Sequence, residues 1–286
     1  MYAVDTGLPK YFINLDRAVE RRDFMERQGR RLGLALDRIR ALEPADVDDK
    51  AYGWMSRCWE RPITRIEIAV LMSHARLWER AAASDTGIVI LEDDAVLSPR
   101  FAAFLQSPPF GDWDLVNLEW VGRRKYFRRA SLGLQGHPRI TAVARDKAGA
   151  AAYYLSPTGA LKLLAALSTR AAPADAFMFR NGRLRIGQAE PALAIQAHIL
   201  AAEGIEPGIR TVTQIHQPRE KLPLRPDTMM YRARRVAAQL GLVRYQLGRL
   251  GPMVLRLPQI DFEEFRQPAE PEALRQAESS RAQSER

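Results

Sequence analysis

Three consecutive carboxylates, Glu92, Asp93 and Asp94, follow the apolar run IVIL at residues 88–91. If the chain stays extended there, alternating side chains place Glu92 and Asp94 on one side and Asp93 on the other. Two carboxylates at this spacing suit Mg²⁺ or Mn²⁺, which bind oxygen ligands and leave positions for substrate phosphates. Such a metal ion could neutralise the charge of a departing nucleoside diphosphate. The alternative is a solvated acidic turn ahead of a helix that begins at Ser98.

A second polar group lies at the end of another apolar run, KYFINL at residues 10–15. Asn14, Asp16 and Arg17 stand where this predicted strand ends and a charged helix begins. Because open α/β sheets bind ligands beyond the carboxyl ends of their strands, Asn14 and Asp16 are candidates for nucleotide recognition and Arg17 for a phosphate contact. In the alternative, Asp16 caps the following helix and the arginine is solvated.

A third candidate pair, Ser73 and His74, lies within the clearest helical segment, residues 63–84. Thr64 and Glu67 give this helix a capping box at its start. Adjacent helical residues point about 100° apart, which argues against a Ser-His nucleophilic pair. Histidine in such a position is more often a packed, hydrogen-bonded residue than a catalyst.

The apolar pattern predicts the elements that position these side chains. Short apolar runs alternate with longer segments of 3.6-residue period, which is typical of an α/β fold with a sheet flanked by helices. We expect a Rossmann-type, mixed but mostly parallel sheet. The expected strands are 10–15, 88–91, 114–120 and 150–156, and the expected helices are 18–33, 63–84, one from Ser98 and one after Pro157. Residues 123–147 are expected to form a long loop or a hairpin.

The chain has 286 residues, which suffices for one large domain and an appendage. We place an α/β domain at residues 1–225 and a basic, amphipathic helical appendage at 226–266. The composition of residues 267–286 predicts a disordered tail.

The composition bounds the class of protein. Hydrophobic residues make up 47% and charged residues 27%, as in ordinary globular proteins. We find no bilayer-spanning apolar stretch and no secretory signal, and the single cysteine, Cys58, excludes an intramolecular disulfide, so we expect a cytoplasmic protein. The net charge of +9 predicts attraction to polyanions, although a GC-rich bacterial genome would also explain the preference for arginine.

Six blocks of sequence occur in order between about residues 10 and 200. They read YFINLDRAVERR (11–22), EIAVLMSHARLW (67–78), VILEDDAVLSPRF (89–101), YYLSPTGALKLL (153–164), PADAFM (173–178) and EPALAIQ (190–196). Together they resemble the family 25 glycosyltransferases, which include bacterial lipooligosaccharide galactosyltransferases and animal collagen galactosyltransferases. The chain departs from the usual pattern at Ala69 and Val70, where a small residue and a cysteine are common, and in having P-A-D for P-V-D.

The resemblance implies a GT-A-like fold and inverting transfer of a hexose from a UDP-sugar to a hydroxyl of a cell-surface glycan. Galactose is the first candidate for the hexose. The E-D-D block would then be the counterpart of the D-x-D metal and nucleotide motif. On this basis Asp94 is the first candidate to bind Mn²⁺ or Mg²⁺, and Glu92 and Asp93 are candidate ligands or ribose contacts. The same resemblance favours a donor-site role for Ser73 and His74.

Inverting transfer needs a base that deprotonates the acceptor hydroxyl. Asp175, which we expect in a Pro-flanked loop, is the first candidate, and Glu119 at the end of a strand is the second. In the alternative, each is an ordinary carboxylate of a loop or sheet edge. Gln196 is expected to have a structural role or to contact the donor sugar.

Two basic segments bear on partners. RRKYFRR at residues 123–129 is either a solvated loop or, given the resemblance, a contact for an anionic, lipid-linked acceptor; we expect no nucleic acid. The amphipathic segment 229–257 could lie on the inner face of an anionic membrane, pack on its own domain or pair with another copy of the chain.

Other functions remain open from the sequence. A metal-dependent phosphohydrolase or nucleotidyltransferase could use the same acidic triplet, although four scattered histidines argue against further metal ligands. A polyanion-binding protein would keep the triplet as structure and bind with a steep dependence on salt. A degenerate transferase would bind nucleotide without turnover.

Overall fold

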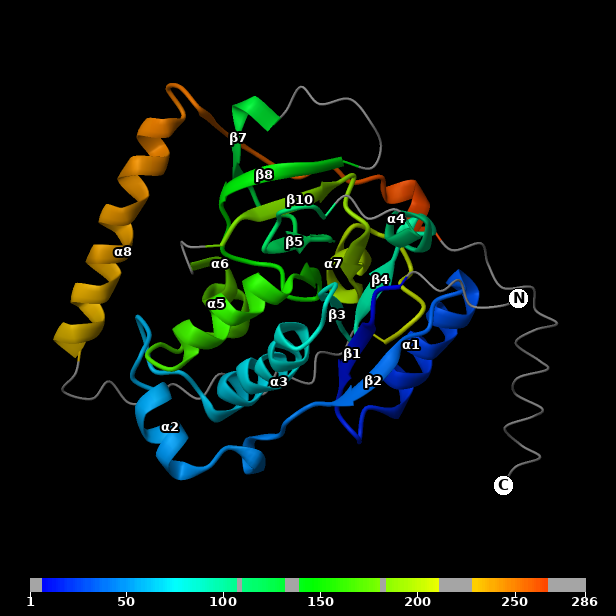
Figure 1. Ribbon diagram of the computed structural model, residues 1–286, viewed down its shortest axis with the longest axis horizontal. Helices are drawn as coiled ribbons and strands as arrows, with labels where there is room; N and C mark the ends of the chain where they lie inside the picture. The colour runs from blue at the N-terminus through cyan, green and yellow to red at the C-terminus, as the bar shows by residue number, and fades with distance from the viewer. Residues whose placement is uncertain (1–6, 107–109, 132–138, 181–183, 211–227, 267–286) are drawn as a thin grey trace.

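The computed structural model describes residues 7–106, 110–131, 139–180, 184–210 and 228–266. Within these ranges, helices flank two sheets (Figure 1). The strands are β1 (Lys10–Asn14), β2 (Asp37–Arg40), β3 (Ile88–Glu92), β4 (Ala95–Leu97), β5 (Leu115–Asn117), β6 (Glu119–Trp120), β7 (Lys125–Arg128), β8 (Arg139–Arg145), β9 (Ala152–Leu155), β10 (Ile186–Glu190), β11 (Ala194–Gln196) and β12 (Met253–Arg256). The α-helices are α1 (Val19–Leu32), α2 (Asp49–Met55), α3 (Arg65–Ala82), α4 (Phe101–Gln106), α5 (Pro157–Leu167), α6 (Ala174–Arg180), α7 (Ala197–Ala202) and α8 (Thr228–Gly248), and the 3₁₀ helices are η1 (Pro44–Asp46), η2 (Arg129–Ser131) and η3 (Phe262–Phe265).

The large sheet has the strand order β12-β7-β8-β10-β5-β9-β3-β1-β2. β1 runs parallel to β2 and β3, and β5 runs parallel to β10, whereas the other described pairings of this sheet are antiparallel. The α/β, GT-A-like class is confirmed, but the expectation of a mostly parallel sheet is wrong. The reason is that β9 enters in the opposite direction between β3 and β5, and β7 with β8 forms a hairpin that β12 extends.

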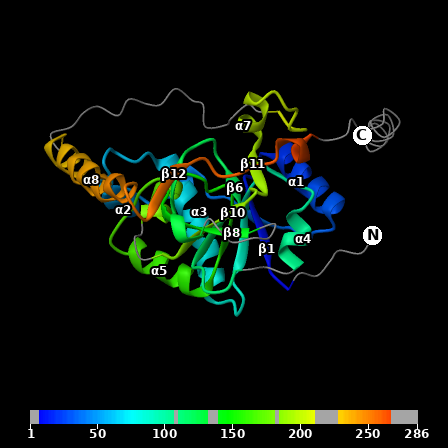
Figure 2. The ribbon, with the colours of Figure 1, turned by 90° about the horizontal axis from the view of Figure 1, so that it is seen from above.

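The apolar strands are buried on both faces, as their continuous apolar runs require. Phe12 of β1 and Leu91 of β3 belong to one core cluster, together with side chains of α1 and α4. Ile13 and Ile90 point the opposite way into a second cluster with α3, α5 and α6. Figure 2 shows α1 and α4 on one side of β1 and α3 on the other. The sheet therefore separates two cores and directs its strand ends to a common edge.

Local signals in the sequence fix several element boundaries. The Thr64 hydroxyl accepts from the Glu67 N–H while the Glu67 carboxylate accepts from the Thr64 N–H, so the predicted capping box is confirmed. Ser156 likewise caps α5. The helix expected from Ser98 begins only at Phe101.

The expected strand 114–120 is divided between two sheets. β5 ends at Asn117 in the large sheet, and β6 begins at Glu119 in a small sheet of order β4-β11-β6. In this small sheet Gln196 lies opposite Ala95, and Ala194 opposite Glu119. The small sheet thereby brings together a strand that follows Asp94, a strand that ends at Gln196 and a strand that begins at Glu119.

The C-terminal segment contributes to the large sheet. The helix expected over 229–257 ends at Gly248, and β12 then pairs with β7 as an edge strand. Phe265 is buried in the core that contains Phe12. The boundary predicted near residue 225 and the tail at 267–286 lie outside the described residues. In the part of the chain that the structure describes, helices fall short of the length and apolarity needed to cross a bilayer.

Candidate functional site

Two cavities lie at the carboxyl ends of β1 and β3. We call the first the strand-end cavity: it has a volume of about 360 Å³, and its lining includes Arg17, Arg21, His74, Asp93 and Asp94. The second, the acidic cavity, measures about 340 Å³. Its lining includes Glu67, Glu92, Glu119, Asp175 and Gln196. Glu92 lines both cavities, so this carboxylate stands at the boundary between them.

Asp93 is held by side chains from β1 and α1. Asn14 donates from Nδ2 to Asp93 Oδ2 at 2.8 Å, and Arg21 donates from Nη1 to Oδ1 at 2.9 Å. The register of β1 against β3, with Ile13 opposite Glu92, brings these residues together. Burial raises the pKa of Asp93, and the charge of Arg21 opposes that effect. Asp93 therefore fixes the strand ends to each other and keeps the Arg21 guanidinium beside the cavity.

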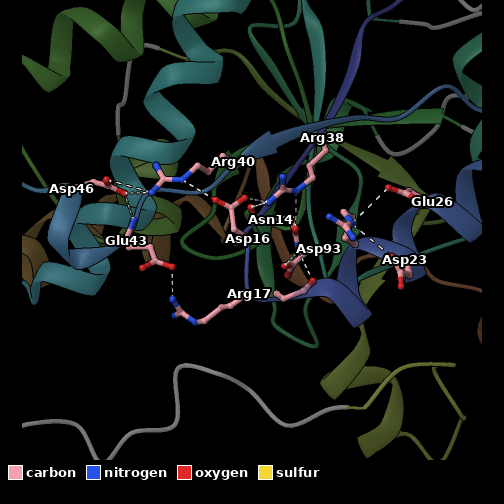
Figure 3. A network of polar contacts seen from close by, with 12 residues as sticks. Asn14, Asp16, Arg17, Asp23, Glu26, Arg38, Arg40, Glu43, Asp46 and Asp93 are labelled. Carbon is pink, nitrogen blue, oxygen red and sulfur yellow. Dashed lines mark hydrogen bonds and ion pairs between the residues drawn. The ribbon is translucent and has the colours of Figure 1, made fainter. Parts of the chain in front are cut away.

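The predicted donor-binding residues Asn14, Asp16 and Arg17 occupy different positions (Figure 3). The Asn14 side chain is buried, and both ends of its amide are hydrogen-bonded within the protein. Nδ2 donates to Asp93, and Oδ1 accepts from Arg38 Nε at 2.8 Å. Asp16 is exposed and pairs with Arg38 and Arg40. Of the three, only Arg17 belongs to the described lining of the strand-end cavity. Asn14 thus acts on the cavity through its partner Asp93, whereas the partners of Asp16 lie outside the described lining.

His74 is oriented by a buried relay of hydrogen bonds. The Trp78 indole N–H donates to the Tyr153 hydroxyl at 3.0 Å, and that hydroxyl lies 2.9 Å from His74 Nδ1. Because an indole N–H can only donate, the Tyr153 hydroxyl has its own proton available for Nδ1. The ring hydrogen of neutral His74 then sits on Nε2, which lies 3.4 Å from Glu92 Oε1. The other Glu92 oxygen accepts from Gln196 Nε2 at 3.3 Å.

Ser73 links α3 to the loop after β2. Its hydroxyl donates to the Ala69 carbonyl at 2.8 Å and accepts from the Leu42 N–H at 2.8 Å. Ser73 and Leu42 both line the strand-end cavity. The hydroxyl is therefore engaged in holding the wall of the cavity in place.

Asp94 is a buried carboxyl group with incomplete hydrogen bonding. Its Oδ1 is buried without a hydrogen-bond partner, and its Oδ2 lies 4.0 Å from Arg21 Nη1. Burial, followed by the negative charge of Glu92, raises the pKa of Asp94 to about 7. Since β3 ends at Glu92 and the chain turns at Asp93, the strict alternation expected for an extended triplet does not apply. A positive group arriving at Asp94 would relieve this repulsion.

Glu119 is buried at the base of the acidic cavity. Its Oε2 accepts from the Ala151 N–H at 2.9 Å, whereas its Oε1 has no hydrogen-bond partner. Burial, with the charge of Glu92, raises the pKa of Glu119 well above its usual range. Gly149 makes room for this carboxyl: its φ is +106°, and a Cβ there would lie 3.2 Å from Glu119 Oε2 and 2.7 Å from Asn117 Nδ2. These surroundings keep Glu119 protonated to a higher pH than an exposed glutamate.

Asp175 lies in the first turn of α6, directly after Pro173 and Ala174, so the expected Pro-flanked loop is a helix start. Its Oδ1 accepts from the Ala176 N–H at 2.6 Å. Burial raises the pKa of Asp175. The carboxylate lines the acidic cavity together with Arg123.

The carboxylates of Asp94 and Glu92 suit a metal ion that is also coordinated by substrate phosphates and water. Within the described residues, no three His, Cys, Asp or Glu side chains form a group that could hold a metal ion. Asp94, however, presents an unpartnered carboxylate oxygen beside Glu92. Mg²⁺ and Mn²⁺ commonly bind one or two carboxylates and complete their shell with substrate phosphates and water.

A buried lysine behind Glu119 was not predicted. Lys125 forms an ion pair with Asp146 at 2.5 Å, donates to Gln188 Oε1 at 2.6 Å and is 1% exposed. Gln188 in turn donates to the Glu119 carbonyl at 3.2 Å. Of the two expectations for residues 123–147, a long loop or a hairpin, the structure has the hairpin of β7 and β8, and Lys125 and Phe127 are buried in β7. The sequence KYFR at residues 125–128 does not alternate polar with apolar residues, so it carries no local signal that Lys125 is buried.

Comparisons with known proteins bear on the family. The sequence profile of the family described as Glycosyltransferase family 25 (LPS biosynthesis protein) matches residues 8–178, more than half of the chain. A protein of Anopheles gambiae named "Glycosyltransferase 25 family member" is 26% identical over 255 residues, which is 76% of this chain and 42% of that protein. Proteins of the same name from Aedes aegypti and Drosophila pseudoobscura pseudoobscura are 29% and 30% identical, over 54% and 59% of this chain and 27% and 29% of their own lengths.

The chain thus spans less than half the length of these curated relatives. The relatives are insect proteins, so the bacterial source and the lipooligosaccharide acceptor remain predictions. The profile match contains both sides of the site, from the end of β1 to Asp175 in α6. The chain belongs to glycosyltransferase family 25.

Proposed function

We propose that the protein transfers a hexose from a UDP-sugar to a hydroxyl of a cell-surface glycan, with inversion at the anomeric carbon. Galactose is the first candidate for the hexose. The observation that carries this proposal is the meeting of the two cavities at Glu92. The strand-end cavity would hold the nucleotide, and the acidic cavity would hold the acceptor and the base. The family membership supports the reaction class.

On the donor side, cationic and carboxylate groups have separate tasks. Arg17 and Arg21 line the strand-end cavity, where they would contact the diphosphate. The apolar side chains of Ile13, Leu15 and Leu42 line the same cavity and would pack against the uracil and ribose. The Nε2–H of His74 keeps Glu92 directed to the boundary, beside the sugar.

Asp94 and Glu92 would bind Mn²⁺ or Mg²⁺ in the complex with the donor. The metal ion would neutralise negative charge on the leaving diphosphate. The raised pKa of Asp94 supports this assignment, because the repulsion between buried carboxylates is relieved when a cation binds.

For the base, the surroundings favour Asp175 over Glu119. A general base must be ionised at working pH, and the pKa of fully buried Glu119 is raised well above its usual range. Asp175 is less buried and faces the acidic cavity, where it would take the proton of the acceptor hydroxyl. Glu119 would then serve as a protonated hydrogen-bond donor to acceptor or sugar.

The acceptor is proposed to be an anionic glycan. Arg123 lines the acidic cavity, and the neighbouring Arg124 is exposed. The positive charges of these arginines offset the carboxylates of the acidic cavity. They could bind phosphate or carboxylate groups of the acceptor beside the reacting hydroxyl.

The test is UDP release from a panel of UDP-hexoses by the purified chain with Mn²⁺, with Mg²⁺ and with EDTA. UDP-galactose is expected to give the fastest release, and EDTA is expected to abolish it. If the chain binds and hydrolyses none of the UDP-sugars, the proposed function is wrong. If another hexose is preferred, only the donor assignment changes.

A further inference from the structure

Helix α8 presents an apolar stripe to solvent. It lies at the periphery of the molecule in both views (Figures 1 and 2). At 100° per residue, Val236, Leu240, Val243 and Leu247 fall within about 60° of one another. Their exposed fractions are 57%, 67%, 46% and 61%, so this stripe is outside the core.

The opposite side of α8 contacts the protein. Arg234 donates from Nη1 to the Trp59 carbonyl at 3.0 Å. The Tyr245 ring lies 5.7 Å from the ring of Tyr126, and the Arg145 guanidinium lies 5.1 Å from the Tyr245 ring centre. These contacts fix the rotation of the helix about its axis, and they leave the stripe directed outward.

The charge around the stripe has one sign. Residues 228–260 contain six arginines and no Asp or Glu. Arg235 and Arg244 are exposed and lie on opposite borders of the stripe, about 100° and 80° from Val236. Near the C-terminal end of α8, Arg129 reaches the Gly251 carbonyl and adds a further partly exposed cation.

We infer that this face of α8 lies on an anionic phospholipid bilayer, parallel to its surface. The apolar stripe would enter the boundary of the acyl chains while the bordering arginines contact lipid phosphates, as in interfacial helices. Arginine stems can extend along the apolar surface and keep their charges at the headgroups. Pairing of the stripe with a second copy is disfavoured, because it would bring two acid-free arginine clusters together.

The placement is independent of the proposed transfer reaction. The helix contacts the domain through Arg57, Trp59, Tyr126 and Arg145, which are absent from the described linings of both cavities. UDP release in the absence of vesicles is therefore expected to be unchanged by substitutions in the stripe.

The test is co-flotation of the full chain with vesicles that contain phosphatidylglycerol, and with vesicles of pure phosphatidylcholine. The parent is expected to float with the anionic vesicles in 0.1 M salt and to remain mostly in solution with neutral ones. Leu247→Gln is expected to weaken binding about tenfold, since glutamine keeps helix propensity but removes apolar burial. Leu161→Gln on α5 is the matched control, because Leu161 is 57% exposed and lies outside the stripe.

The electrostatic part is tested with Arg235→Gln/Arg244→Gln. This pair is expected to weaken binding to anionic vesicles about twentyfold, whereas Arg27→Gln/Arg30→Gln on α1 is expected to have a small effect. The inference is overturned if the parent does not float with anionic vesicles, or if the Leu247 and Leu161 variants behave alike. It is also overturned if sedimentation shows a dimer that Leu247→Gln dissociates while vesicle binding stays unchanged.

Discussion

His74 and Glu92 face each other across the boundary of the two cavities, with 3.4 Å between Nε2 and Oε1. The buried relay from Trp78 through Tyr153 sets the ring hydrogen on the side of Glu92. Through this contact His74 sets the position of Glu92 and interacts with its charge. The buried residues His74 and Trp78 of α3 are thereby coupled to the place where the sugar would lie.

The relay predicts the effect of Tyr153→Phe. The substitution leaves Trp78 Nε1 and His74 Nδ1 without their shared partner, so the free energy of unfolding should fall by about 1–3 kcal/mol. UDP release should fall about tenfold as the His74 tautomer is no longer fixed. Tyr154→Phe is the matched control, since it removes only a hydrogen bond from that hydroxyl to the Thr86 carbonyl. Equal UDP release by the two variants would contradict the relay.

Asp94 predicts a dependence of stability on pH. Its pKa is 3.8 in the unfolded chain and about 7 in the fold. A carboxyl with a raised pKa gives stability that is complete below pH 3.8 and is lost as the pH rises through 7. The loss amounts to roughly 4 kcal/mol.

This dependence is measured as the difference between the parent and Asp94→Asn, because the lowered pKa values of Glu67 and Glu190 give the opposite slope. Urea unfolding from pH 4 to pH 8 should show the variant gaining stability relative to the parent. Asp23→Asn, at a half-exposed side chain of α1, should run parallel to the parent. A difference curve that is flat with pH would refute the buried state of Asp94.

Amide variants distinguish the proposed roles of Asp175 and Glu119 in the reaction. Asp175→Asn should lower turnover about 10²–10⁴-fold with little change in UDP affinity, as expected for loss of a general base. Glu119→Gln should lower turnover less than about tenfold, because the amide resembles the protonated carboxyl that the surroundings favour. Steady-state rates and UDP binding by calorimetry check both. The opposite ranking would move the base to Glu119.

Lys125 predicts a large effect on stability. Lys125→Met leaves buried Asp146 without its counter-ion and should cost about 3–5 kcal/mol in the free energy of unfolding. Adding Asp146→Leu should restore much of that loss, since no buried charge then remains. Lys147→Met, at an exposed neighbour, is the control. If Lys125→Met unfolds at the same urea concentration as the parent, the ion pair is not buried as described.

The sequence predicted those parts of the fold that local physics determines. Apolar continuity marked β1 and β3, and Thr64 with Glu67 marked the start of α3. The acidic triplet was correctly placed at a strand end because an apolar run passes directly into charge there.

Contacts between distant segments could not be read in this way. The direction of β9 depends on its pairing with β3 and β5 in the large sheet. The burial of Glu119 depends on a small sheet whose strands come from three separate regions. Lys125 resembled a solvated residue because its partners, Asp146 and Gln188, come from other parts of the chain. The hydrogen bonds of Asn14 could not be predicted either, because its partners Asp93 and Arg38 meet it only in the folded sheet.

The most direct test of the proposed reaction is the rate of UDP release from UDP-galactose with Mn²⁺ by the parent, Asp94→Asn and Asp23→Asn. Asp94→Asn is expected to lose at least about 10²-fold in rate while retaining its fold, and Asp23→Asn is expected to keep the parent rate. Equal rates for the parent and Asp94→Asn would contradict the assignment of Asp94 to the metal and the donor diphosphate.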